Sequence, residues 1–387
     1  MIKYDNKKNI LVNTALTGDN IEKYLFPFER ETDYDQRKLM SYYTNFMLPM
    51  LRSLVIPLFG QDITRTYNNI DYESFLLNVD GKDSSIEEFL IKVLINYKAQ
   101  GAGYIIFEYP EYSNEPYLVY KNQTELFGYE IIDNQIEAIE FINGYTKDNK
   151  RIILGYTNYE VYEYVEGDEK NKRTLQQLDF MPIIFLNPDI AVSSPFYDIA
   201  KICINIYNLD SEQRDQERTS AFSILEIPND NPDENVLMKK DSIIYIPTDA
   251  SRGSAYISPD AAILKTLRES SESLIERLWK LASNNGVLVN KTSSNSGESY
   301  KMEFLGANVE LTNLARFVED IEKAIAEMYM LMKGISFTFD VQYTKTFAMP
   351  VSEVQNQIDM LKSAKELGIS FTEEELIALK NNILRAL

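Results

Sequence analysis

Histidine is absent from this chain of 387 residues, and cysteine and tryptophan occur once each. Without histidine there is no His-based catalytic triad, no zinc site of the His-Cys type and no imidazole to shuttle protons near neutral pH. The single cysteine, Cys203, cannot form an intramolecular disulfide. It lies among apolar residues at helical spacing, so a place in the core is favoured over a reactive thiol. Most hydrolase mechanisms are therefore excluded.

Long apolar runs are also missing. The longest candidate, Leu48 to Phe59, is interrupted by Pro49, Arg52, Ser53 and Pro57, and it is far shorter than the roughly 20 residues that cross a bilayer. The first residues contain lysines but no apolar segment followed by a small-residue cleavage site. We therefore expect no membrane span and no secretory signal, and we expect the protein to be assembled in a cytoplasm.

The composition is that of a folded protein, with 44% hydrophobic and 25% charged residues. Its formal net charge is −20. Nonspecific affinity for nucleic acid comes from lysine and arginine neutralising phosphates, so this charge opposes general binding to DNA. Any contact with DNA is expected to be local or weak.

No motif for catalysis stands out. Gly81-Lys82 is followed by Asp83 and lacks the upstream glycine of a nucleotide-binding loop, and Gly101-Ala102-Gly103 follows a helix and lacks the third glycine of a dinucleotide site. Acidic pairs such as Glu87-Glu88 lie in first turns of helices, where the helix dipole explains them. We expect no enzyme activity, no cofactor and no bound metal.

The first half of the chain reads as an α+β region. Residues 1–33 read as an arm, and Asp33 to Phe59 as one helix kinked at Pro49. A second helix begins at Ser84, whose hydroxyl forms a capping box with Glu87, and it ends at Gly101. A mostly antiparallel sheet follows, with turns at Asn143-Gly144 and Glu166 to Asp168 and with strands at 104–109, 117–120, 129–132, 136–143, 151–156, 159–165 and 183–186.

Two helices with polar stretches dominate the second half. The first begins at Ser194-Pro195, and its apolar stripe stops before Asp210 to Ser220, which contains no apolar residue. The second begins at Ser258-Pro259 and runs to about Ser283. If the two are antiparallel, their polar stretches lie together beside a β-containing insert, and only neighbouring chains or solvent are left to cover them.

The remainder combines a polar segment with helices. Asn284 to Lys301 has the composition of a mobile loop, and a long helix is predicted from about Val309 to Lys333. Phe337 to Tyr343 reads as a strand, and 352–367 and 372–387 as two terminal helices.

The order of these parts resembles that of the portal proteins of tailed bacteriophages. Local sequence resembles that family along about residues 20–345, in the segments Tyr24-Leu25-Phe26-Pro27-Phe28-Glu29 with Tyr34 to Met50, Ser84 to Glu108, Ser194 to Arg218, and Phe339-Asp340-Val341-Gln342-Tyr343. The resemblance implies an α/β wing, a two-helix stem, a small β-containing clip, a long wing helix and a short helical C-terminal crown. The implied bounds are arm and wing 1–190, first stem helix 191–221, clip 222–257, second stem helix 258–284, tunnel loop 285–303, wing helix and strand 304–348, and crown 349–387.

In function, the resemblance implies a ring, usually of twelve copies, at one vertex of the capsid of a virion. Its channel would conduct double-stranded DNA during packaging and ejection, with weak contacts that do not depend on sequence. Implied partners are further copies of the chain, the major capsid protein, the terminase large subunit and tail adaptor or connector proteins. Candidate positions are Lys291, Thr292, Ser293, Ser294, Asn295 and Ser296 in the DNA-facing loop; Asp210, Arg214, Arg218, Lys265, Arg268 and Lys280 in the stem lumen or between subunits; and Asn229, Asp230, Asp249 and Arg252 in the clip.

Two other functions remain open. A head-tail connector or other virion structural protein without a channel would share the composition, and it would be a stable monomer or a six-fold ring without a long stalk. A DNA-processing enzyme would need a catalytic motif that the sequence does not contain, and its substrate would be repelled by the net charge.

Overall fold

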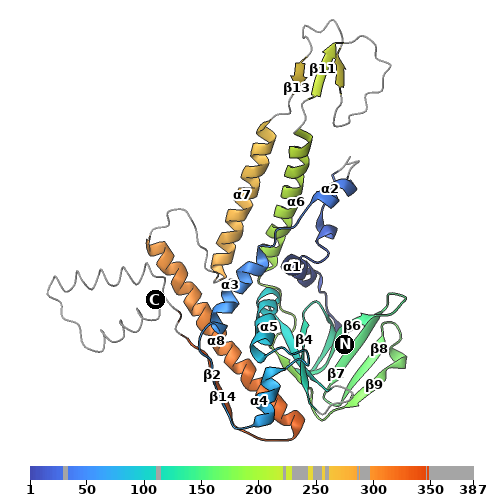
Figure 1. Cartoon of the computed structure of the whole chain (residues 1–387). Helices are drawn as coiled ribbons and strands as arrows, with labels where there is room; N and C mark the ends of the chain where they lie inside the picture. Colours follow the sequence, from blue (N-terminus) through green and yellow to red (C-terminus); the bar gives the residue numbers. More distant parts are fainter. Residues whose placement is uncertain are drawn as a thin grey trace, which may run out of the picture.

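The computed structural model describes residues 1–28, 34–109, 115–220, 224–228, 243–246, 255–257, 261–285, 287, 297–345 and 347. Within them the chain is a mixed α and β protein, in which two helices project from a globular part (Figure 1). The helices are α1 (Lys7–Thr17), η1 (Ile21–Tyr24), α2 (Tyr34–Met40), α3 (Met47–Phe59), α4 (Ile70–Leu77), α5 (Ile86–Gln100), η2 (Glu169–Asn171), α6 (Tyr197–Ser220), α7 (Ala261–Asn284) and α8 (Gly297–Lys333). The strands are β1 (Ile2–Lys3), β2 (Thr64–Tyr67), β3 (Gly103–Glu108), β4 (Tyr117–Asn122), β5 (Leu126–Ile132), β6 (Gln135–Tyr145), β7 (Arg151–Thr157), β8 (Glu160–Val165), β9 (Arg173–Gln177), β10 (Ile183–Phe185), β11 (Ile224–Pro228), β12 (Ile243–Ile246), β13 (Ala255–Ile257) and β14 (Phe339–Gln342).

The sheets of the first half confirm the predicted antiparallel arrangement. One sheet has the order β1-β5-β6-β7-β8-β9 and a second the order β10-β3-β4, and every neighbouring pair in both is antiparallel. All seven predicted strands are present. The sequence pattern missed β9 because all five of its side chains are exposed, so no alternation of apolar residues marks it.

One predicted turn is wrong. Asn143-Gly144 lies inside β6, where the register with β7 shifts and Gly144 has φ +157°, so the pair forms an irregularity of the strand. The turn between β5 and β6 is formed by Asp133 and Asn134, whose φ values are 50° and 65°. Two successive positive φ angles characterise the two-residue hairpin turn that matches the twist of the strands.

The helix predicted from Asp33 to Phe59 is two helices, α2 and α3, joined by residues 41–46. Pro49 does not kink a helix, because it lies in the first turn of α3, where a missing backbone N–H leaves no helical hydrogen bond unmade. The side-chain oxygen of Asn45 accepts a hydrogen bond from the Leu48 backbone N–H (3.0 Å) and so helps to start α3 there.

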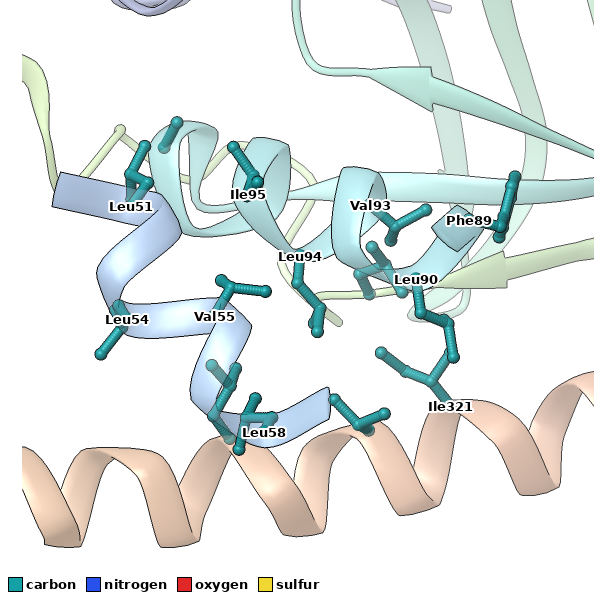
Figure 2. Close-up of a cluster of buried hydrophobic side chains, with 14 of the residues drawn as sticks. Leu51, Leu54, Val55, Leu58, Phe89, Leu90, Val93, Leu94, Ile95 and Ile321 are labelled. Carbon is teal, nitrogen blue, oxygen red and sulfur yellow. The ribbon is translucent and has the colours of Figure 1, made fainter. Parts of the chain in front are cut away.

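The main core lies where α3, α5 and α8 meet (Figure 2). Helix α3 contributes Leu51, Leu54, Val55 and Leu58 to this cluster, and Ile321 joins it from α8. The side chains from α5 are Phe89, Leu90, Val93, Leu94 and Ile95. Each of these side chains is at most 7% exposed. Burial of this apolar area fixes α8, the longest described helix, against the globular part.

The N-terminal residues are not the arm that the sequence predicted. Helix α1 buries Val12, Ala15 and Leu16 in the main core. Its periodicity was hidden because polar Asn9, only 2% exposed, shares the buried face. The Asn9 amide donates to the Gln100 side-chain oxygen (2.9 Å), and the Gln100 amide donates to the Asn9 backbone oxygen (3.2 Å), so neither amide is left unsatisfied.

Helix α5 begins one residue later than predicted. Its capping box pairs Ser85 with Glu88 rather than Ser84 with Glu87: the Ser85 hydroxyl accepts from the Glu88 backbone N–H, and the Glu88 carboxylate accepts from the Ser85 backbone N–H. The helix ends at Gly101 as predicted, with φ +83°.

Replacing Gly101 by alanine is expected to lower the free energy of unfolding by about 2–4 kcal/mol, from left-handed backbone strain and overpacking together. A Cβ atom there would lie 2.9 Å from the Val192 side chain and 3.1 Å from the Pro195 ring. Gly81→Ala is the matched control, because Gly81 also has positive φ (+68°) but open space around it, so only roughly 1 kcal/mol of strain is expected. Urea denaturation of both variants checks this, and equal losses would contradict the steric part.

Helix α8 begins at Gly297, twelve residues before the predicted Val309 and inside the predicted loop 285–303. Residues 298–303 contain no helix breaker, so a polar composition alone did not define a loop. The predicted strand near 337–343 is β14, which pairs antiparallel with β2. The two terminal helices predicted at 352–367 and 372–387, and all of 349–387, lie outside the described residues.

Candidate functional site

Helices α6 and α7 lie side by side and antiparallel, and we call this pair the stalk (Figure 1). The far end of the stalk carries a three-stranded sheet with the order β12-β11-β13, in which β11 is parallel to β12 and antiparallel to β13. All three strands were predicted within the insert 222–257. The candidate clip residues Asn229, Asp230, Asp249 and Arg252, and the candidate loop residues Lys291 to Ser296, lie outside the described residues.

The basal half of the stalk is apolar. The predicted stripe on α6 is buried with the preceding Phe196, and each of its members is at most 3% exposed: Phe196, Ile199, Ala200, Cys203, Ile206 and Tyr207. From α7, Leu278 and Ala282 are fully buried. Cys203 is a core residue as predicted, and burial raises the pKa of its thiol to about 12, so it is not a nucleophile at neutral pH.

The outer half of the stalk is held by polar contacts between and along the two helices. The Ser271 hydroxyl donates to Asp210 (3.2 Å), and Arg268 forms an ion pair with Glu217 of α6 (2.9 Å). Within single helices, Arg218 pairs with Asp215 (3.0 Å) and Lys265 with Glu269 (3.8 Å). Two separate contacts therefore cross the stalk, from Asp210 to Ser271 and from Glu217 to Arg268. Lys280 is exposed and lies in the basal half of α7.

The pKa values of two carboxylates in the stalk are shifted in opposite directions. Burial raises the pKa of Asp210, although Ser271 and Arg214 act against the shift. Hydrogen bonds from Gln213 and Arg268 lower the pKa of Glu217. Ionised Glu217 therefore stabilises the fold above its unfolded-state pKa, and this contribution is lost as the pH falls through the folded-state pKa. Ionised Asp210 destabilises the fold, and this cost is relieved as the pH falls through its raised pKa.

Other parts of the same chain cover much of the polar stretch of α6. From the sequence we expected only neighbouring chains or solvent to cover it. Ser211 is 2% exposed, and the rest of 210–218 is only half-exposed. Beside it lies α2, whose Arg37 is 3% exposed and donates to the Ser211 hydroxyl (3.0 Å) and to the Phe26 backbone oxygen (2.6 Å). The Arg214 guanidinium lies 3.1 Å from the centre of the Tyr42 ring. These partners are 170 or more residues distant in sequence, so local patterns did not reveal them.

Substituting Arg37 by alanine should detach α2 from the stalk. Hydrogen bonds from a charged group contribute about 1.5–3 kcal/mol each at most, and the Phe28 ring, 4.3 Å from the guanidinium, also loses its partner. We expect faster backbone hydrogen exchange in residues 34–40 and unchanged exchange in residues 197–207. Lys38→Ala, which alters an exposed residue of the same helix, should change neither segment. Unaltered exchange of α2 in the Arg37 variant would show that other contacts hold it.

Among the residues that the structure describes, no three histidine, cysteine, aspartate or glutamate residues are grouped so as to hold a metal ion. None of the described helices is both long and apolar enough to span a membrane.

No protein-family model and no curated protein matches the chain. Solved structures similar to it include three chains of gene transfer agent (GTA) particles. One is from the neck of the empty particle computed with C6 symmetry (TM-score 0.46, 11% identity, 92% of this chain and 95% of that chain). One is from the virion of the native particle (0.42, 12%, 97% and 99%), and one is from the native neck computed with C12 symmetry (0.44, 10%, 98% and 95%).

Proposed function

We propose that the chain is the portal subunit of a tailed phage or of a related particle, with a structural rather than a catalytic role. Copies of it form a ring of about twelve around a channel, at one vertex of the capsid. The globular part corresponds to the wing, the stalk to the stem, and the sheet of β11, β12 and β13 to the clip.

The stalk is the observation that supports this proposal. Two helices of 24 residues each leave the globular part with an apolar base, and they hold a small sheet at their far end. The outer half of α6 is polar throughout and lacks an apolar face. The side of it that Arg37 and Ser271 leave uncovered suits a position beside other polar helices around a wet channel. Half-exposed ion pairs such as Glu217–Arg268 can be exchanged with a neighbouring copy at little energetic cost.

The negative charge of the chain fits passage of DNA. A conduit must not bind the strand that it conducts, and a net charge of −20 per subunit repels phosphates. Of the cationic stem candidates, Arg214, Arg218, Lys265 and Arg268 are engaged by an aromatic ring or carboxylate of their own chain. Lys280 forms no ion pair with any described residue, so among these candidates it is the one best able to touch a phosphate transiently.

The partners follow from the same assignment. In the proposal the clip docks on the terminase large subunit during packaging and on tail adaptors afterwards, and the wing contacts the major capsid protein. Double-stranded DNA touches only the channel wall. The virion is the site of action, after assembly in the host cytoplasm.

Negative-stain microscopy and native mass spectrometry of the purified chain test the proposal. We expect closed rings of about twelve copies with a central hole and with stalks on one side. A stable monomer, or a six-fold ring in which the stalks do not surround a channel, would refute the portal assignment. Such a result would favour a connector without a channel, which the sequence also left open.

A further inference from the structure

Helix α2 buries its arginine and exposes its apolar residues. Arg37 is 3% exposed, whereas Leu39 is 87% and Met40 46% exposed. Tyr42, two residues beyond the end of the helix, is 62% exposed. Leucine and methionine are among the residues most often buried in proteins, and arginine is among those most often exposed. We call Leu39, Met40 and Tyr42 the outer face of α2, and their exposure indicates a surface that a partner covers.

The inner side of α2 is fixed, so the helix cannot turn to bury its outer face. The Arg37 guanidinium donates to the Ser211 hydroxyl of α6 (3.0 Å) and to the Phe26 backbone oxygen (2.6 Å). Arg218 of α6 donates to the Met40 sulfur (3.4 Å). Rotation of α2 about its axis would take the buried charge of Arg37 away from its acceptors. The outer face is therefore held away from the chain's own core.

A second apolar surface, only partly covered, lies on the outer half of α7. Leu264 and Leu267 belong to the same helical stripe as the fully buried Leu278, but both are only half-buried. Among the described residues, they neither belong to a buried apolar cluster nor pack against one. The stretch of α6 beside them contains Glu217, which pairs with Arg268, and it has no apolar residue to offer.

The two surfaces lie at the same level of the stalk but cannot meet within one subunit. Arg218 of α6 contacts Met40 of α2. One residue away, Glu217 pairs with Arg268 of α7, which follows Leu267 in the sequence. Helix α6 lies between α7 and α2 and separates the two surfaces (Figure 1). Two different surfaces on one subunit form a heterologous contact between copies, and such contacts generate a ring when the rotation between copies closes.

We propose that the outer face of α2 docks on α7 of a second copy of the chain, against Leu264 and Leu267. This inference rests on the proposed ring, and it names a contact that holds the stalks side by side. The occupant is a second copy because the chain itself carries the matching apolar surface at the matching level. Copies with a net charge of −20 repel one another, so an attraction that does not depend on charge suits this contact.

Photo-crosslinking of the full chain tests the contact. Benzoylphenylalanine is placed at position 39, where the side chain is exposed, and rings are co-assembled from ¹⁵N-labelled and unlabelled subunits. Mass spectrometry then distinguishes links between copies from links within one copy. We expect links between copies that end in residues 261–275. The same photoreactive residue in place of Ile70, which is 80% exposed in α4, is the matched control and should give no link to α7.

A change of charge provides the second measurement. Leu39→Lys makes the net charge less negative, so general repulsion between copies falls. It should nevertheless raise the concentration at which half of the subunits are assembled by roughly tenfold or more, because a charge replaces a buried leucine. Adding Leu267→Glu should recover part of this loss. Ile70→Lys makes the same change of charge away from the stalk and should leave assembly unaltered, as measured by mass photometry.

Closed rings in which position 39 gives no link to α7 of another copy would overturn this contact and leave the portal assignment intact. Rings that form equally well with Leu39→Lys would have the same meaning. Subunits that neither associate nor cross-link would show that both the contact and the portal assignment are wrong. The cross-linking experiment leaves α7 unaltered, so it decides the question even if Leu267→Glu disturbs the stalk.

Discussion

Replacing Arg65 by methionine is expected to lower the free energy of unfolding by about 3–5 kcal/mol, because it leaves a buried carboxylate without its cation. The Arg65 guanidinium donates to both oxygens of Glu322 (2.8 and 2.9 Å) and to Glu87 (2.8 Å). Glu322 is 1% exposed, so water cannot replace the lost partner. Urea denaturation at neutral pH, followed by circular dichroism, measures the loss.

A second substitution provides the control. Adding Glu322→Gln to the Arg65 variant removes the unpaired charge, and we expect it to restore part of the lost stability, because a neutral amide costs less to bury than an unpaired carboxylate. Arg52→Met, at an exposed position of α3, should change the free energy of unfolding by less than about 0.5 kcal/mol. If the double variant were less stable than Arg65→Met alone, the loss would come from packing rather than from the buried charge.

This network joins elements that are remote in sequence. Arg65 belongs to β2, Glu87 to α5 and Glu322 to α8, and the Tyr343 hydroxyl, just after β14, also donates to Glu322. The Tyr343 backbone N–H donates to Glu319 (2.8 Å). The position of α8 against the β2–β14 pair is therefore set by polar contacts as well as by the apolar core. A single sequence carries no signal for such pairings, because each residue taken alone reads as a solvated charge.

The features that could be predicted are those with local causes. Alternating apolar residues and turn residues revealed the antiparallel strands, and the proline-marked starts with apolar stripes revealed both stalk helices. The three strands of the insert were found for the same reason. Each of these signals acts within about ten residues, so no long-range contact had to be known.

The predictions that were wrong concerned features that depend on residues distant in the sequence. Helix α1 was read as an arm because Asn9 takes part in its buried face through Gln100, 91 residues away. The polar stretch of α6 was taken to need neighbouring chains, but Arg37 and Ser271 of the same chain reach it. The sequence contains no indication that Glu140 is buried, because only the pairing of β6, β7 and β8 places it beside two tyrosines. The sequence therefore predicted the two helices of the stalk, but it did not predict the contacts that their side chains make.

The anchorage of α7 offers a second test with a large expected effect. Helix α6 contributes many buried side chains to the core, whereas Leu278 and Ala282 are the fully buried apolar residues among those described in α7. Leu278→Ala should therefore lower the free energy of unfolding by about 2–5 kcal/mol, and its first consequence should be loosening of α7 at the base of the stalk. Trp279, the only tryptophan of the chain, lies next to it and packs edge-on against Phe46, with ring centres 6.5 Å apart.

Tryptophan fluorescence therefore reports this loosening directly. In the Leu278→Ala variant we expect a red-shifted emission and a transition at lower urea concentration than the one that circular dichroism records, because α7 separates before the globular core unfolds. Leu278→Met keeps the volume and should cost less than about 1.5 kcal/mol, with the emission unchanged. Coincident transitions in the alanine variant would contradict a separable stalk and would make α7 part of a single cooperative unit. The proposed portal ring would then depend on Leu278 for the stability of the whole subunit, rather than only for the position of the sheet at the end of the stalk.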